Sequence, residues 1–334
     1  MVKAYKQTGK REYLASAEAG IRYLLLMQKE NGGFPQFYPD SSSYRGQITY
    51  NDNAMINALN VLWDVAYGKN GLEIVDASLK APSHKAVDKG IDCILKTQIR
   101  VNGRLTGWCA QHDKQTLLPV KARAFELPAI TGMETVGIVE FLMKIENPSP
   151  QIKNAIISAM DWLAVSKVRG YKYSDVEDPS QPKGKDRVLV KDDAAAVWAR
   201  FYDIETNKPM FAGRNGEKKW NLQEIEVERR TGYAWYGTWP QKLFDKTYPQ
   251  WQKKNGTVTA KAYIVVSQDG KGDYASIQEA VNALPDTSAT PRTIHIKPGI
   301  YNEKIFITKH NIILLGENRE STKIIQSIAR DEWR

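Results

Sequence analysis

The sequence of 334 residues has few of the residue types from which common catalytic and metal centres are built. It contains four histidines and two cysteines, Cys93 and Cys109. Two cysteines exclude a disulfide framework, and they either pair with each other or remain as buried thiols. There is no nucleotide-binding glycine loop, Ser/His/Asp arrangement or CxxC pair. No apolar run reaches membrane length, and the first twenty residues show no signal-peptide core.

Charge and aromatic residues are plentiful. The formal net charge is +9, the isoelectric point is about 9.2, and the chain has 9 Trp and 16 Tyr. A basic chain favours an acidic partner such as nucleic acid, an anionic membrane surface or a polyanionic substrate, although a solvated basic surface explains the charge equally well. Flat rings beside cations suit sugar rings or bases, but most such rings belong to a core.

Three segments share one apolar pattern at helical spacing. They start at Gly20, Gly90 and Ala159, so the offsets are 70 and 69 residues. Further helices are expected between them, for instance from Asn53 and from Met133. The period indicates helical hairpins joined by long loops, unless three amphipathic helices match by coincidence.

The remaining chain divides by composition. Residues 168–191 predict loop with short strands, 198–213 an extended segment, and 222–244 a return to helix. Residues 245–262 are polar and lack periodicity, which is typical of a linker. From 263 to 334, alternating runs between turn signals predict short, evenly spaced strands.

Residues 5–244 resemble family 10 of the polysaccharide lyases, the pectate lyases. Nine motifs carry the resemblance: GGFPQFYP (32–39), TYNDNAM (49–55), GIDCILKTQI (90–99), GWCAQHD (107–113), ARAFELP (122–128), GIVEFLM (137–143), VWARFY (197–202), FAGRNG (211–216) and RRTGYAWYGTWPQKL (229–243). The resemblance implies an α/α toroid. It also implies an Ile-Asp-Asn calcium and substrate motif, which would fall before Met1, so we expect an N-terminally incomplete module.

Residues 263–334 resemble the opening of family 8 of the carbohydrate esterases, the pectin methylesterases. The motifs are VSQDGKGDYASIQEAVNALP (266–285) and IKPGIYNEK (296–304). The resemblance implies the first coils of a right-handed parallel β-helix, without the later motifs that carry esterase chemistry. We therefore expect a mainly α chain: a lyase toroid over 1–244, a linker over 245–262 and a C-terminally incomplete β-helix.

The first resemblance implies anti-β-elimination on polygalacturonate, in which a base removes a C5 proton and the C4–O bond breaks. That proton becomes acidic only if Ca²⁺ and basic side chains neutralise the neighbouring carboxylate. Arg123, in ARAFELP, matches the family's catalytic arginine. A guanidinium has a pKa above about 12, so such a base needs nearby cations and a dry site. Without the resemblance, a surface salt bridge is the simpler interpretation.

Asp52, in TYNDNAM, matches an acidic residue that helps to hold calcium and substrate. Hard oxygen ligands suit Ca²⁺. The alternative is helix capping, because Asp52 directly precedes an expected helix. Asn53 is a weaker candidate for substrate binding.

Arg200 and Arg214 match arginines that contact galacturonate carboxylates in the family. Guanidinium pairs bidentately with a carboxylate, which favours arginine over lysine. Lys121 either polarises the site or is a surface lysine. Four further side chains, with packing as the alternative for each, are candidates for lining a groove: Trp108, His112, Trp235 and Trp239.

In the C-terminal region, Tyr301 and Glu303 match only the esterase family's opening signature, and packing is their alternative role. We expect no esterase activity and weak or no lyase activity from this chain. The parent protein is expected to be extracellular or periplasmic and monomeric, with pectin as partner and neither nucleic acid nor membrane. Rival interpretations are a pectinesterase, which would release methanol, and a non-catalytic module that retains pectin.

Overall fold

The computed structural model describes residues 1–39, 42–101, 104–255, 263–284 and 292–326. The chain divides into two compact units. The first comprises Met1–Ile99 and Thr106–Tyr248, and the second comprises Arg100–Leu105 and Pro249–Arg334. Within the described part of the chain, no helix combines the length and apolar character needed to cross a bilayer.

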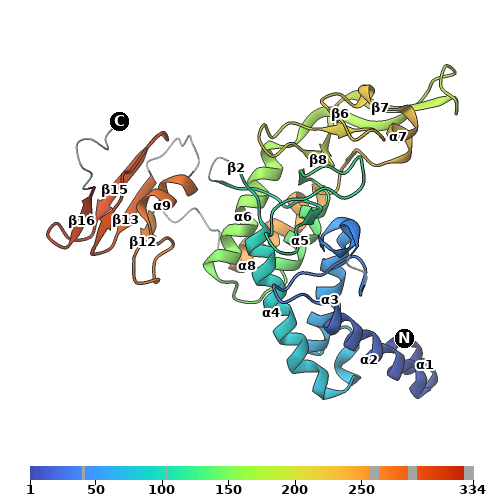
Figure 1. The fold of residues 1–334 in the computed structure, drawn as a ribbon, viewed down its shortest axis with the longest axis horizontal. Helices are drawn as coiled ribbons and strands as arrows, with labels where there is room; N and C mark the ends of the chain where they lie inside the picture. Colours follow the sequence, from blue (N-terminus) through green and yellow to red (C-terminus); the bar gives the residue numbers. More distant parts are fainter. Residues whose placement is uncertain (40–41, 102–103, 256–262, 285–291, 327–334) are drawn as a thin grey trace. The chain divides into compact units, whose positions relative to one another are not determined.

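The first unit contains most of the helices (Figure 1). They are α1 (Val2–Thr8), α2 (Arg11–Met27), α3 (Ala54–Tyr67), α4 (Lys80–Thr97), α5 (Glu134–Leu142), α6 (Pro150–Val165) and α7 (Val227–Gly232). The three patterned segments lie in α2, α4 and α6, with α3 packed against α2 and α4. Gly90 permits the close contact between α3 and α4, because a Cβ there would lie 2.4 Å from Leu59 Cδ2.

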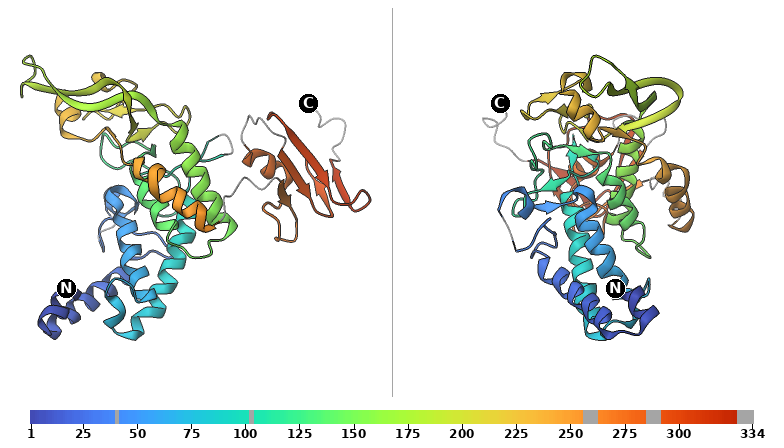
Figure 2. Two further views of the ribbon diagram at one scale, coloured as in Figure 1. Left: turned by 180° about the vertical axis from the view of Figure 1, so that it is seen from behind. Right: turned by 90° about the vertical axis from the view of Figure 1, so that its right-hand side faces the viewer.

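A long antiparallel hairpin occupies the region in which we predicted loop with short strands. Strand β6 (Val168–Glu177) pairs with β7 (Lys185–Ala199), from Val168 opposite Val197 to Glu177 opposite Lys185. Both figures place this hairpin at the end of the first unit opposite α1 and α2 (Figure 2). The loop prediction was wrong because polar side chains are common on a two-stranded ribbon that faces water on both sides.

Short strands connect the other loops of the first unit. They are β1 (Ile48–Thr49), β4 (Gln111–His112), β5 (Ile130–Thr131), β8 (Phe201–Tyr202), β9 (Phe211–Ala212), β10 (Lys218–Lys219) and β11 (Tyr236–Gly237). β1 pairs with β4, β5 with β8, β9 with β10, and β11 with β7. The extended segment predicted over 198–213 therefore contains two of these strands.

Aromatic side chains dominate the core of the first unit. Trp108, Trp198 and Trp235 are fully buried. Cys93 and Cys109 are both free and buried, and burial raises the pKa of Cys93 to about 12. The two thiols therefore act as small apolar groups of the core.

The second unit contains β2 (Arg100–Val101), β3 (Arg104–Leu105), β12 (Tyr263–Val266), β13 (Arg292–Ile296), β14 (Gly299–Asn302), β15 (Ile312–Gly316), β16 (Thr322–Ile325) and α9 (Ile277–Ala283). β12, β13 and β15 form a parallel sheet, and β14 pairs in parallel with β16. Tyr301 is fully buried there and donates to the Lys297 carbonyl oxygen at 3.0 Å. Glu303 accepts from the amides of Ile277 and Gln278, each at 2.9 Å, so it caps α9.

The predicted fold class, a mainly α chain of an α/α toroid followed by β-helix coils, was wrong. The structure is 41% helix and 22% strand, and its described strands form no closed or solenoid sheet. The prediction weighted the apolar helices and passed over the polar β6–β7 hairpin and the many two-residue strands. In the second unit, the described strands make only open sheets of three and two strands.

Helix also replaces irregular chain after residue 242. A π-helical turn over Leu243–Thr247 continues into α8 (Tyr248–Asn255). The first part of the predicted linker is therefore helical, and residues 256–262 lie outside the described residues. The helix predicted over 222–244 contains α7 but also β11, so it is shorter than expected.

Candidate active site

Backbone hydrogen bonds join the segments that carry several of the candidate residues. The amide of Asn51 donates to the Ala110 carbonyl oxygen at 2.9 Å. The amide of Gly132 donates to the Arg200 carbonyl oxygen at 2.9 Å. The amide of Arg200 in turn donates to the Trp235 carbonyl oxygen at 2.7 Å. The side chains of Asn51 and Arg200 therefore start from well-fixed backbone positions.

Arg200 is the centre of a buried polar cluster. Its Nη2 donates to Glu134 Oε1 at 2.7 Å, to Asn51 Oδ1 at 3.1 Å and to Asp52 Oδ1 at 3.4 Å. The side chains of Arg200 and Glu134 are only 6% and 1% exposed, whereas that of Asp52 is 68% exposed. Arg200 therefore links a buried carboxylate to one that faces solvent.

The cluster leaves two buried polar atoms without a hydrogen-bond partner, Glu134 Oε2 and Arg200 Nε. Burial raises the pKa of Glu134, and the charge of Arg200 offsets part of that rise. Burial, the largest single effect, lowers the pKa of Arg200, but the charge and hydrogen bond of Glu134, with the nearby Tyr233 and Asp52, together raise the pKa above its ordinary value. Such a charged, incompletely satisfied cluster is typical of a functional site.

The backbone at Asp52 and Asn53 is unusual. Both residues have left-handed conformations, with φ of 52° and 59°, which non-glycine residues seldom adopt. Neither side chain makes a capping hydrogen bond at the start of α3. Asn53 instead lies against α5, since a Cβ on Gly137 would be 2.1 Å from Asn53 Oδ1. The structure therefore gives no support to the capping interpretation of Asp52, and this backbone directs its carboxylate toward Arg200.

Arg123 is held by a buried carboxylate three residues later. Its Nε donates to Glu126 Oε2 at 2.8 Å, and its Nη2 donates to Oε1 at 2.5 Å. The Tyr233 hydroxyl donates to the same Oε1 at 3.0 Å. The hydrogen bonds to Glu126 and the negative charge of Glu126 stabilise the Arg123 cation, so they raise the pKa of Arg123. A salt bridge, the simpler sequence interpretation, is therefore present.

Arg229 is a candidate that the sequence analysis missed. Its side chain is buried, its guanidinium carbon lies 4.2 Å from the centre of the Phe125 ring, and its Nε has no hydrogen-bond partner. Among the described residues, no carboxylate pairs with it. The adjacent Arg230 is different, because it forms a buried bidentate pair with Asp186. The motif RRTGYAWYG contains both arginines, but only tertiary contacts separate their roles.

Three guanidinium groups converge on the ring of Tyr233. Their central carbon atoms lie 4.8 Å (Arg200), 5.6 Å (Arg229) and 6.0 Å (Arg123) from the ring centre. The ring attracts cations through its negative face and separates the three charges. Residues from three segments far apart in the sequence, one of them helix α7, therefore form one basic cluster, and Arg200 joins this cluster to the carboxylate of Asp52.

Two other sequence candidates, Arg214 and Lys121, lie near the loop that contains Gly216. Arg214 makes an exposed bidentate pair with Glu228, at 2.6 Å and 3.2 Å. A Cβ on Gly216 would lie 3.7 Å from Lys121 Nζ, which places this amine beside the same loop. Within the described part of the chain, the side-chain ion pair of Arg214 is with Glu228 and not with the cluster around Tyr233.

The aromatic candidates and His112 pack rather than line a groove. Trp108 is fully buried, and its indole nitrogen donates to the Ile94 carbonyl oxygen at 2.8 Å. Trp235 is also fully buried, and Trp239 packs over Gly237. Burial lowers the pKa of His112 to about 4, so its ring is neutral at ordinary pH. The structure favours the packing alternative for these side chains.

The described residues supply few ligands for Ca²⁺. No group of three or more His, Cys, Asp or Glu side chains in the described part of the chain could hold a metal ion. Asp52 offers an exposed carboxylate, but Asn51 Oδ1 and Glu134 Oε1 already accept hydrogen bonds from Arg200. Because Ca²⁺ takes six to eight oxygen ligands, these residues alone do not complete a site.

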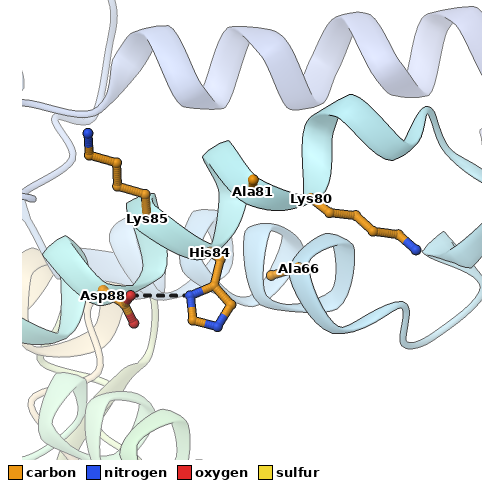
Figure 3. A pocket seen from close by; sticks show the side chains of 6 residues that line it. All are labelled: Ala66, Lys80, Ala81, His84, Lys85 and Asp88. Carbon is orange, nitrogen blue, oxygen red and sulfur yellow. Dashed lines mark hydrogen bonds and ion pairs between the residues drawn. The ribbon is translucent and has the colours of Figure 1, made fainter.

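The surface of α3 and α4 has a shallow hollow of about 540 Å³ (Figure 3). It is lined by Ala66, Lys80, Ala81, His84, Lys85 and Asp88. The dashed line in Figure 3 joins His84 Nδ1 and Asp88 Oδ2, which lie 3.2 Å apart. The two side chains are exposed and are one helical turn apart. None of the sequence candidates lines this hollow, so it does not compete with the arginine cluster.

Comparison with known proteins identifies both regions of the chain. The family model described as pectic acid lyase matches residues 1–244, and the pectinesterase model matches residues 263–333. Several curated pectinesterases are similar to a short stretch of the chain. A probable pectinesterase/pectinesterase inhibitor 58 from Arabidopsis thaliana is 43% identical over 70 residues, 20% of this chain and 12% of that protein. A pectinesterase from Daucus carota is 43% identical over 76 residues, 22% of this chain and 23% of that protein. The chain thus spans less than a quarter of these relatives.

Solved structures match the larger region. The family 10 polysaccharide lyase from Cellvibrio cellulosa is 33% identical, with a TM-score of 0.69, over 76% of this chain and 76% of that chain. A mutant of the same enzyme in complex with trigalacturonic acid gives the same identity and TM-score over 76% of this chain and 77% of that one. These likenesses agree with the match over residues 1–244, and the chain belongs to the pectic acid lyase family, the family 10 polysaccharide lyases.

Proposed function

We propose that this chain cleaves polygalacturonate by calcium-dependent anti-β-elimination, with the weak activity expected from its sequence. The observation that carries the proposal is the convergence of three guanidinium groups on Tyr233, beside the exposed carboxylate of Asp52. Polygalacturonate carries one carboxylate on every sugar, and guanidinium groups pair with carboxylates in a bidentate manner. The trigalacturonic acid bound to the related lyase supports the same substrate class.

The basic side chains divide the binding of substrate between them. Arg200 and Arg229 are buried, and their positive charges would stabilise a substrate carboxylate bound beside the cluster. Arg214 and Lys121 are exposed and would bind a neighbouring sugar carboxylate. Asn53 would contribute a hydrogen bond at the start of α3. Neutralising the carboxylate that adjoins C5 lowers the barrier to removing the C5 proton.

The elimination itself requires a base, and we assign that role to Arg123. A neutral Arg123 takes the C5 proton, the C5–H electrons form the C4–C5 double bond, and the C4–O bond breaks. The leaving oxygen takes a proton from water. The positive charges of Arg200 and Arg229 favour a neutral Arg123, whereas Glu126 opposes it.

Calcium, when bound, supplies a positive charge that neutralises substrate carboxylates. Asp52 is the residue of this chain that would contribute a ligand, because its carboxylate is exposed. Since the described residues do not complete the shell, the remaining oxygens would come from elsewhere, and no catalytic step is assigned to the ion.

The test is the ultraviolet absorbance of unsaturated uronides formed from polygalacturonate, with Ca²⁺ and with a chelator. We expect absorbance to rise with Ca²⁺ and to stop with the chelator. Arg123→Lys should lower kcat at least 100-fold, in line with the loss of a general base. The matched control is Arg187→Lys, which alters an arginine paired with Asp175 on the β6–β7 hairpin. An unchanged rate in Arg123→Lys, or no product from the parent chain, would refute the proposal.

The match to pectinesterases supports a second candidate, demethylation of pectin by the protein of which the second region is part. Methanol release from methylated pectin without a rise in ultraviolet absorbance would favour it. Retention on polygalacturonate with no product after long incubation would instead favour a binding module.

Both families process pectin, a polysaccharide of cell walls. We therefore propose that the protein acts outside the cytoplasm, in an extracellular or periplasmic location. Pectin is its proposed partner, and we propose that it works as a monomer.

A further inference from the structure

The ion pair between Arg123 and Glu126 is unusually well enclosed on its acidic side. The Glu126 side chain is 2% exposed, whereas that of Arg123 is 43% exposed. Both carboxylate oxygens are occupied: Oε2 by Arg123 Nε and the Arg123 amide, and Oε1 by Arg123 Nη2 and Tyr233. A buried carboxylate with this number of donors has one orientation, and it imposes that orientation on the guanidinium.

The local chain also fixes the two partners relative to each other. The amide of Glu126 donates to the Arg123 carbonyl oxygen at 3.0 Å. The amide of Ala122 donates to the Glu126 carbonyl oxygen, also at 3.0 Å. These bonds close a tight turn. Phe125, which is buried, lies under the guanidinium with its ring centre 4.9 Å from the Arg123 central carbon. The turn therefore presents the outer face of Arg123 to the solvent side of the site.

Other charged and titratable groups face this arginine from several elements. They are Tyr44 in the 3-10 turn Ser43–Gly46, Tyr233 after α7, and, through the shared rings of Phe125 and Tyr233, Arg229 and Arg200. Lys121 precedes the turn by one residue. Among these groups and the rest of the described chain, Glu126 is the one carboxylate in an ion pair with Arg123.

We propose that Glu126 is a positioning residue for Arg123, and that the Tyr233 hydroxyl fixes Glu126 so that the guanidinium stays aligned within the arginine cluster. The inference rests on the proposed lyase function. It adds a residue outside the sequence candidates, and it has a consequence for the pH dependence of the reaction. Glu126 raises the pKa of Arg123, so the fraction of neutral Arg123 at a given pH is smaller than it would be without this carboxylate.

The decisive variant is Glu126→Gln, which keeps the shape and one acceptor but removes the charge. If Arg123 is the base, the acid limb of the kcat/KM profile should move to lower pH by at least one unit. A smaller kcat at the optimum should accompany the shift, because Arg123 is held less firmly. The matched control is Asp175→Asn, which removes the carboxylate partner of Arg187 on the hairpin and should leave the profile unchanged.

A second variant tests the role of the hydroxyl. Tyr233→Phe retains the ring beside the three guanidinium groups and removes only the bond to Glu126 Oε1. We expect kcat to fall between three- and tenfold with KM changed less than twofold. A uniform loss of activity in Glu126→Gln without a shifted limb would overturn the inference, since a merely structural residue would act in that way. If that variant does not fold, an unchanged kcat in Tyr233→Phe overturns the inference.

A measurement without turnover separates this inference from the proposed function. The Nε proton of Arg123, assigned in NMR spectra by its loss in Arg123→Lys, should exchange slowly with solvent in the parent chain. Exchange should be at least tenfold faster in Glu126→Gln. If the unsubstituted chain makes no unsaturated product, the proposed function fails. Equal exchange rates in the unsubstituted chain and in Glu126→Gln would refute the positioning role itself.

Discussion

Replacing Arg200 with methionine should strongly destabilise the first unit. The substitution keeps a long side chain but leaves Glu134, only 1% exposed, without a cation. Breaking a buried pair by removing one partner costs about 3–5 kcal/mol, because an uncompensated charge remains inside. The acceptor Asn51 Oδ1 also loses its donor, which adds about 1 kcal/mol.

The size of this effect should depend on pH in a defined direction. Burial raises the folded-state pKa of Glu134, so the contribution of this group to stability is complete below its unfolded value of about 4.3. The contribution is lost as pH rises through the folded-state pKa. Without Arg200 that pKa rises further, so the deficit of Arg200→Met should be smaller at pH 4 than at pH 8.

Urea unfolding followed by tryptophan fluorescence measures the effect, since Trp198 and Trp235 are fully buried in this unit. Adding Glu134→Gln to Arg200→Met removes the stranded charge and should recover at least half of the lost free energy. Arg214→Met is the matched control, because its pair with Glu228 is exposed and should contribute little. A deficit no larger than that of the control, or no recovery in the double variant, would contradict the reasoning.

Three further predictions follow from buried groups of the first unit. Arg230→Met should lower the free energy of unfolding by about 3 kcal/mol or more in urea, because Asp186 loses its buried partner. Since burial lowers the pKa of His112 to about 4, stability should fall as pH drops from about 6.5 to about 4, and His112→Gln should show a smaller fall in the same titration. Cys93 and Cys109, both buried, should react with a thiol reagent only after denaturant is added; rapid labelling of the native chain would show this assignment to be incorrect.

Helices were the most predictable part of the fold. The segments at Gly20, Gly90 and Ala159 lie in helices because apolar residues at helical spacing define a face that must be buried. The β6–β7 hairpin was not predicted, because both of its faces carry polar side chains and its pairing is settled by distant contacts. One of these is the bond from the Tyr173 hydroxyl to the Arg230 carbonyl oxygen at 2.9 Å.

The candidate site was predictable in part. The motif resemblance selected Arg123, Arg200 and Asp52, and the structure joins Arg200 directly to Asp52. The motif resemblance did not select Arg229 or Glu126 as site residues, because no local sequence pattern distinguishes either side chain from a surface charge. Their significance lies in burial and in missing or shared hydrogen bonds, which depend on residues far away in the sequence.

By itself, the sequence determined the family and the helices that carry the core, because motifs and apolar spacing are local properties. Only the tertiary structure decided which charges act together. Arg229 and Arg230 are adjacent, yet among the described residues Arg229 has no carboxylate partner, whereas Arg230 forms a bidentate pair with Asp186. Electrostatic interactions depend on distance and burial rather than on sequence separation, so the cluster around Tyr233 exists only once these distant segments are folded together.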